Sequence, residues 1–196
     1  MGTQSTLTSF GFWRVIRQRV ASMLLLLIAS LMFVNSQATA QPVVQSPELN
    51  GGDPYRLVFV TSTTRNALSD NIADYNSFIN DAANAVPELL DLGATFRVIG
   101  STPTVNAVDN ISFEGSANVP IYLVDGSRVA NTNADLFDGA IDHAINYDEL
   151  GNAVGDEAVF VGSFTDGTLS GVQSFGAGPT TIVGSTIALD GGFLFS

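Results

Sequence analysis

Cysteine and lysine are absent from this 196-residue sequence, and histidine occurs once, as His143. Without cysteine the chain forms no disulfide and no thiolate metal site. Without lysine it has no P-loop phosphate site and no Schiff-base chemistry. A single imidazole excludes a zinc site with several histidines, and a Ser-His-acid triad would have to use His143. The string nearest to G-x-S-x-G, residues 171–176 (GVQSFG), places its serine one residue late.

Positive charge is scarce outside the N-terminus. Four arginines follow residue 40, and against all 19 acidic residues they give residues 41–196 a formal charge of −15. Such a surface repels phosphate backbones, whose binding depends on basic side chains. The sequence therefore argues against nucleic acid and anionic membrane as partners.

The N-terminus has the order of a secretory signal. Arg14, Arg17 and Arg19 precede an apolar run at residues 20–34, and Ala38-Thr39-Ala40 supplies the small residues that a signal peptidase recognises. The run is shorter than the roughly 20 residues of a spanning helix. We expect a signal peptide at residues 1–40, a mature N-terminus at Gln41 and no membrane span after cleavage, which makes the protein secreted, either extracellular or on the cell-envelope surface. The alternative is an uncleaved anchor helix.

The rest of the chain is predicted to form a linker, residues 41–54, and one domain, residues 55–196. Residues 55–60 (YRLVFV) are typical of a strand. A residue among 69–71 is predicted to cap an amphipathic helix that ends before Pro87, and a second short helix is expected at residues 87–90, with Gly93 just beyond its end.

Beyond Gly93 the pattern changes to short apolar runs separated by turn residues. Strands are predicted at residues 95–99, 119–124, 158–161, 181–183 and 193–195, with Asp-Gly turns beginning at 125, 138, 166 and 190. Helices that precede strands, instead of alternating with them, indicate the α+β class. The apolar phases of these elements predict a core of Phe59, Ile72, Phe78, Phe96, Tyr122, Phe137 and Phe160.

Several stretches carry a family resemblance. They are residues 57–65 (LVFVTSTTR), 71–76 (NIADYN), 92–99 (LGATFRVI), 119–131 (VPIYLVDGSRVAN), 134–139 (ADLFDG), 145–151 (INYDELG) and 160–167 (FVGSFTDG). In this order they resemble a family of exported bacterial domains of unknown function. Its members often carry a C-terminal sorting tail with a Pro-Glu-Pro motif, which is not found here. The resemblance implies a C-type-lectin-like, endostatin-like fold, in which an N-terminal strand and helix precede a twisted antiparallel sheet with long loops.

The densest polar group in the sequence suggests an ion site. Asn131, Asn133, Asp135, Asp138 and Asp142 offer the oxygen ligands that calcium prefers. The loop is not an EF-hand, because its sixth position is Leu136 and its twelfth is Asp142. The alternative is that these residues cap turns through their own backbone.

These observations predict an exported, non-enzymatic domain that binds carbohydrate or matrix outside the cell. Two alternatives remain at this point. One is an enzyme that acts on extracellular polysaccharide through carboxylates such as Asp135 and Asp138, and the other is a purely structural matrix protein.

Overall fold

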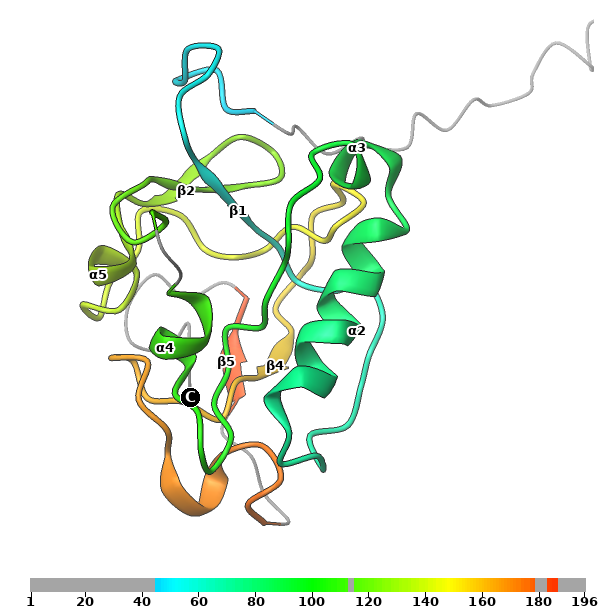
Figure 1. The fold of residues 1–196 in the computed structure, drawn as a ribbon, viewed down its shortest axis with the longest axis vertical. Coiled ribbons are helices and arrows are strands. Elements are labelled where there is room, and N and C mark those ends of the chain that lie inside the picture. The colour runs from blue at the N-terminus through cyan, green and yellow to red at the C-terminus, as the bar shows by residue number, and fades with distance from the viewer. Residues whose placement is uncertain (1–44, 113–114, 179–182, 187–196) are drawn as a thin grey trace, which may run out of the picture. The chain divides into compact units, whose positions relative to one another are not determined.

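The computed structural model describes residues 45–112, 115–178 and 183–186, and all of them belong to the unit Thr39–Ser196 (Figure 1). The predicted signal peptide and Gln41 lie outside the described residues. The class is α+β, with short helices and two small sheets. In chain order the elements are β1 (Arg56–Val58), α2 (Ile72–Asn84), α3 (Pro87–Leu90), α4 (Ala107–Ile111), β2 (Ile121–Leu123), β3 (Arg128–Ala130), α5 (Asn133–Leu136), β4 (Ala158–Phe160), the 3-10 turn Gly171–Gln173 and β5 (Val183–Ser185).

The longest described helix, α2, begins and ends where the sequence predicts. The Asn71 side chain accepts a hydrogen bond from Ala73 N at 3.1 Å, which satisfies one of the unpaired amides of the first turn. Pro87 ends this segment and opens α3 at its first position, and Gly93 follows with a φ of 60°. With 13 residues, α2 is too short to cross a bilayer, and no other helix of the described residues crosses one.

The first sheet has the order β1-β2-β3 and is mixed. β1 pairs with β2 in parallel, and β2 pairs with β3 antiparallel through the predicted Asp-Gly turn, where Gly126 has a φ of 92°. Because α2, α3 and α4 lie between β1 and β2 in the chain, the connection is long enough for a parallel crossover. The prediction of an antiparallel sheet is therefore wrong for the β1–β2 pair.

Residues 95–99 form no strand, contrary to the prediction, because asparagine side chains take up their backbone groups. Asn80 Oδ1 accepts from Phe96 N, and Asn76 Oδ1 accepts from Val98 N, each at 3.0 Å. Asn76 and Asn110 exchange two amide hydrogen bonds of 2.9 Å, and Asn110 also donates to Val98 O. Asparagine side chains of α2 and α4 thus supply the hydrogen bonds that a neighbouring strand would supply to a strand. Asn110 is itself buried.

These hydrogen bonds of the Asn76 and Asn110 side-chain amides, which we call the amide ladder, predict that Asn76→Ala lowers the stability of the fold. The substitution leaves Val98 N and Asn110 Oδ1 without these partners, and we expect it to lower the free energy of unfolding by roughly 2 kcal/mol. Asn84→Ala is the matched control, because Asn84 lies exposed on the same helix and gains the same helix propensity. Urea denaturation should show a clear shift of the midpoint for Asn76→Ala alone, and equal shifts would contradict the ladder.

The core consists of two clusters of buried side chains. One contains Val58, Ala107, Ile111, Ile121, Leu123, Val129, Ala130, Leu136, Phe137, Ile141 and Val161, and the other contains Ala83, Val86, Leu89, Phe96 and Val124. Of the predicted core residues, Phe96, Tyr122 and Phe137 are buried, whereas Phe59, Ile72 and Phe78 are partly buried. Phe160 is 49% exposed, so its prediction is wrong. It lies on β4, whose partner strand among the described residues is β5.

The second sheet contains β4 and β5 in antiparallel pairing. β4 matches the strand predicted at residues 158–161. β5 begins at Val183, the last residue of the strand predicted at 181–183, whose other residues lie outside the described ones. The strand predicted at 193–195 and the turn at 190 also lie outside them.

The described part of the predicted linker is attached to the first sheet. Ser46 is buried and donates a hydrogen bond of 2.8 Å to Gly126 O in the β2–β3 turn. Glu48 lies 3.8 Å from the guanidinium of Arg128 on β3. Residues 45–54 therefore pack on the β2–β3 hairpin.

Candidate functional site

A cavity of about 960 Å³ lies beside β1, and its size is within the usual range for ligand sites. Its walls come from the loop at residues 61–67, from residues 94–99, from β4 and β5, and from one face of α2. That face shows Tyr75, Phe78 and Ile79, at the spacing of neighbouring helical turns. Further apolar side chains on the walls include Leu57, Phe59, Phe96, Ile99 and Val159.

The walls hold most of the positive charge of residues 41–196. Their charged residues are three arginines and two acids: Arg56, Arg65, Arg97, Asp148 and Glu157. Residues 41–196 contain four arginines and 19 acidic residues, and three of these four arginines lie on the wall. Burial lowers the pKa of Arg56, but an arginine guanidinium stays charged in proteins.

β1 presents one edge of its backbone to this cavity. Arg56 N donates to Pro120 O and Val60 N donates to Tyr147 O, each at 2.9 Å, so the even-numbered residues pair toward β2. Strand geometry directs the backbone groups of Leu57 and Phe59 the opposite way. β1 is the last strand of its sheet, and neither residue forms a hydrogen bond along that side with any described residue. We call these N–H and C=O groups the free edge of β1.

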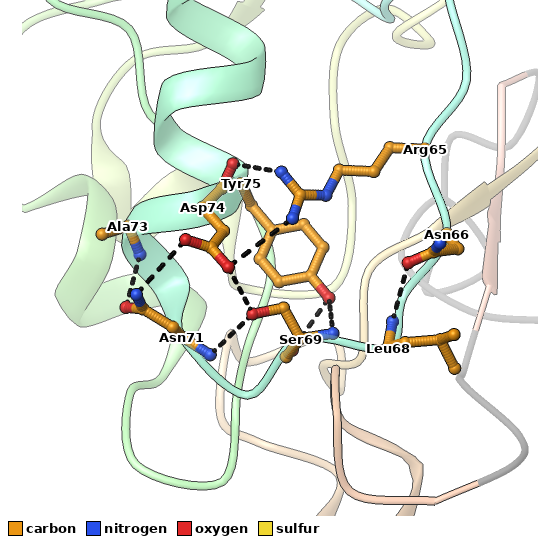
Figure 2. A network of polar contacts seen from close by, with 8 residues as sticks. All are labelled: Arg65, Asn66, Leu68, Ser69, Asn71, Ala73, Asp74 and Tyr75. Atoms are coloured by element: carbon orange, nitrogen blue, oxygen red, sulfur yellow. Dashed lines mark hydrogen bonds and ion pairs between the residues drawn. The ribbon is translucent and has the colours of Figure 1, made fainter.

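A polar network holds the chain that enters α2 against the cavity wall (Figure 2). Ser69 Oγ donates to Asp74 Oδ2 at 2.7 Å, and Arg65 forms an ion pair of 3.6 Å with the same oxygen. The Arg65 guanidinium also lies over the Tyr75 ring, 4.8 Å from its centroid. The Tyr75 hydroxyl donates to Ser69 O and accepts from Ser69 N, so its hydrogen-bonding capacity is used within the network.

Two buried carboxylates stand near the same wall, and both are engaged by the backbone. Glu149 accepts from Ser62 N at 2.7 Å and from Ser62 Oγ at 2.5 Å, and it thereby fixes the loop at residues 61–67. Asp148 accepts from Leu150 N and from Asn152, which contributes both its backbone and its side chain. The contacts of Asp148 are thus those of a turn residue, whereas those of Glu149 join two distant parts of the chain.

The only imidazole of the chain has a structural contact as well. His143 Nδ1 lies 2.6 Å from Arg128 O, and because a carbonyl only accepts, Nδ1 carries the proton. No hydrogen bond joins His143 to a serine hydroxyl among the described residues, so they contain no Ser-His pair that could activate a nucleophile.

Comparisons with family profiles, known proteins and solved structures found no match to this chain. The site therefore has to be interpreted from its own geometry.

The structure brings Asn131 and Asp135, two of the five predicted calcium ligands, together. Asp135 Oδ2 accepts from Asn131 N at 2.6 Å and from Asn131 Nδ2 at 2.8 Å. Thr132 Oγ1 accepts from Asp135 N at 3.1 Å and caps α5, a short helix that the sequence analysis missed.

Asn133, the third of them, is buried and turned to other partners. Its Oδ1 accepts from Arg56 and its Nδ2 donates to Ser112 Oγ at 3.0 Å. A side chain that ties β1 to α5 in this way is unavailable for an ion on the surface loop.

The last two, Asp138 and Asp142, each have a local partner. Asp138 Oδ1 accepts from Ala140 N at 3.2 Å, and Asp142 Oδ2 forms an ion pair of 3.0 Å with Arg128 Nε. Across residues 45–112, 115–178 and 183–186, no three His, Cys, Asp or Glu side chains are arranged to hold a metal. The calcium site stays a prediction from sequence, and the function proposed below does not depend on it.

These contacts predict how the protein responds to calcium. Because the five side chains already have protein partners, we expect the same melting temperature in millimolar calcium and in chelator. A calcium site would instead stabilise the folded state by about 2.7 kcal/mol at 100 times its Kd, which raises the melting temperature by several degrees. A calcium-dependent rise that Asp135→Asn removes would restore the ion-site hypothesis.

The tyrosines predict a loss of stability at high pH. Burial raises the pKa of Tyr75, of Tyr55 and of Tyr122 above the ordinary value of 10.0. The unfolded chain therefore ionises first, and the free energy of unfolding should fall as pH rises from about 10. No lysine titrates in this range. Urea denaturation from pH 9 to 11 should show this fall, and Tyr75→Phe should reduce it; a flat profile would contradict the assignment.

Proposed function

We propose that residues 41–196 form an exported binding domain without enzymatic activity, and that its ligand occupies the cavity beside β1. The observation that carries this proposal is the cavity itself, which combines a ligand-sized volume, mainly apolar walls and a backbone edge. The ligand classes that fit an exported domain are carbohydrate and matrix polymer.

The groups around the cavity favour binding over catalysis. An acid-base mechanism needs a proton donor or acceptor free to reach the substrate, whereas the buried carboxylates Asp148 and Glu149 accept hydrogen bonds from their own loop and from Ser62. Asp135 and Asp138, the carboxylates named for the polysaccharide-cleaving alternative, are not among the lining residues of the cavity, and they accept hydrogen bonds from Asn131 N and from Ala140 N.

The cellular address and the fold are part of the same proposal. The basic, apolar and small-residue order of residues 1–40 supports export to the extracellular space or the cell-envelope surface. The α+β class and the order of strand before helix are compatible with a C-type-lectin-like fold, which the resemblance to the exported bacterial family implies.

The test uses the exported product of the full chain and measures its binding to a panel of extracellular polysaccharides and matrix proteins by calorimetry. Ala158→Trp places a large ring on the cavity wall, and Ala85→Trp makes the same change at an exposed residue that is not among the lining residues. We expect binding to a member of the panel that Ala158→Trp weakens at least tenfold and Ala85→Trp leaves unchanged. Turnover of any panel member, or equal binding by both variants, would contradict the proposal.

A further inference from the structure

The turn at residues 50–53 contains the only Asn-Gly pair of the sequence. It belongs to the segment at residues 45–54 that packs on the β2–β3 hairpin. Asp53 N donates to Asn50 O at 3.1 Å and closes the turn, and Gly52 has a φ of 97°. None of these residues lines the cavity, so the turn lies outside the proposed binding site.

The structure leaves the atoms of this Asn-Gly pair accessible. Asn50 and Gly51 are both exposed, and the Gly51 N–H donates to no described residue. A Cβ at Gly51 would meet nothing within 4 Å. Glycine also has no Cβ of its own that would hinder the approach of its nitrogen to the preceding side chain. Gly51 N can therefore reach Asn50 Cγ without displacing another part of the fold.

The Asp-Gly pairs of the chain are less favoured for the same attack. The amides of Gly126 and Gly167 donate to backbone carbonyls within their own turns, each at 3.0 Å. An aspartate side chain also has to react as the protonated acid, which is scarce at neutral pH. An asparagine amide needs no such protonation, so Asn50 is the most reactive of these positions.

We propose that Asn50 is a site of spontaneous deamidation, and that the carboxylate formed there opens the turn at residues 50–53. Gly51 N loses its proton to water and bonds to Asn50 Cγ, and the side-chain amide nitrogen leaves as ammonia. Water then opens the resulting five-membered imide at either of its two carbonyls, which gives aspartate or isoaspartate at position 50. Overall, one water is consumed and one ammonia is released, with no oxidant or reductant.

Asp53 is the reason why the new charge opens the turn. Its Oδ2 accepts from Asn50 N at 2.9 Å and from Asn50 Nδ2 at 3.2 Å. Deamidation replaces the Nδ2 donor with a negatively charged oxygen, so that attraction becomes repulsion between two carboxylates. Isoaspartate in addition inserts a methylene into the backbone, which displaces Asp53 N from its acceptor. Both products therefore weaken the contacts that hold the turn.

The first test follows the reaction in the exported product of the full chain, incubated at neutral pH. Trypsin cleaves after Arg56, and the peptide from the predicted N-terminus Gln41 to Arg56 contains Asn50 as its only asparagine. We expect this peptide to change in mass by the exchange of NH for O, faster per asparagine than any other peptide, and to separate into two isomers. A rate no higher than that of the other peptides would overturn the proposal.

Gly51→Ala supplies the matched control. The φ of Gly51 lies outside the left-handed region and the space at its Cβ position is open, so alanine fits there without strain. Its methyl group hinders the attack on Asn50. We expect deamidation to be at least about tenfold slower, which corresponds to a barrier higher by about 1.4 kcal/mol. Equal rates in the two proteins would contradict attack by Gly51 N.

Asn50→Asp tests the effect of the charge apart from the reaction. We expect the Asp53 amide resonance to move toward its position in the urea-unfolded chain, and high salt to reduce this change because ions screen exposed charges. Asn84→Asp adds the same charge at an exposed position of α2 and should leave the resonance unchanged. If Asn50→Asp and the deamidated protein both keep the native Asp53 resonance, the turn stays closed and the proposed consequence is wrong.

Discussion

Phe175→Ala should lower the free energy of unfolding by about 3 to 5 kcal/mol, the usual cost of removing a buried phenylalanine. Phe175 is 2% exposed and stacks on Tyr75, with ring centroids 4.3 Å apart. Its N–H donates to Ser101 O at 2.9 Å, so the residue joins the chain after β4 to α2 and to the segment before α4. Truncation leaves a void between these parts that backbone shifts cannot fully close.

The matched control is Phe160→Ala. The sequence analysis predicts Phe160 in the core, but in the structure its ring is exposed. Chemical denaturation of both variants should give a loss for Phe160→Ala of about 1 kcal/mol or less. If Phe160→Ala cost as much as Phe175→Ala, the assignment of the core would be incorrect.

Gly176→Ala should be nearly as damaging, with an expected loss of roughly 3 kcal/mol or more. Gly176 has a φ of 71°, a left-handed conformation that disfavours any side chain, and its N–H donates to Ala67 O at 2.8 Å. A Cβ there would lie 2.4 Å from Asp70 N and 2.6 Å from Ser69 C. These are backbone atoms of the segment that leads into α2, so the clash is not relieved by rotating a side chain.

Two other glycines separate the causes of this loss. Gly93 has a φ of 60° with open space around its Cβ position, so Gly93→Ala should show the conformational cost alone, about 1 to 2 kcal/mol. Gly155 has neither a left-handed φ nor a close neighbour, and Gly155→Ala should change stability little. Losses of unfolding free energy that did not increase in the order Gly155, Gly93, Gly176 would show that the close approach to Asp70 does not govern the effect.

Local signals in the sequence were sufficient to predict the helices α2 and α3. Asn71 caps α2 and Pro87 opens α3, because capping and the geometry of proline act within a few residues. The sequence analysis missed the helices α4 and α5 because short helices leave little local pattern. The helices α4 and α5 have five and four residues, too few to show a helical period.

Contacts between distant residues explain the remaining differences. Residues 95–99 have the composition of a strand, but the amides of Asn76 and Asn80 supply their hydrogen bonds, and no local rule predicts that exchange. Phe160 and Phe175 both lie in apolar, glycine-rich sequence, and only tertiary packing decides that the second is buried.

The candidate site was not predicted, because a cavity arises from elements far apart in the chain. The sequence directed attention to oxygen-rich residues such as Asp135 and Asp138, which the structure places in turns with their own partners. The one available signal was the strand at residues 55–60, which lacks lysine and proline. It becomes informative only when its neighbours in the sheet are known.

The account depends most on the claim that β1 presents a free backbone edge to an open cavity. Hydrogen exchange of the exported protein without ligand, resolved by residue with NMR, tests it directly. Arg56 and Val60 donate to Pro120 O and Tyr147 O, so their amides should exchange slowly, whereas the amides of Leu57 and Phe59 between them should exchange much faster. Equal protection of all four amides would show that the edge is already paired, and would contradict the proposed binding site.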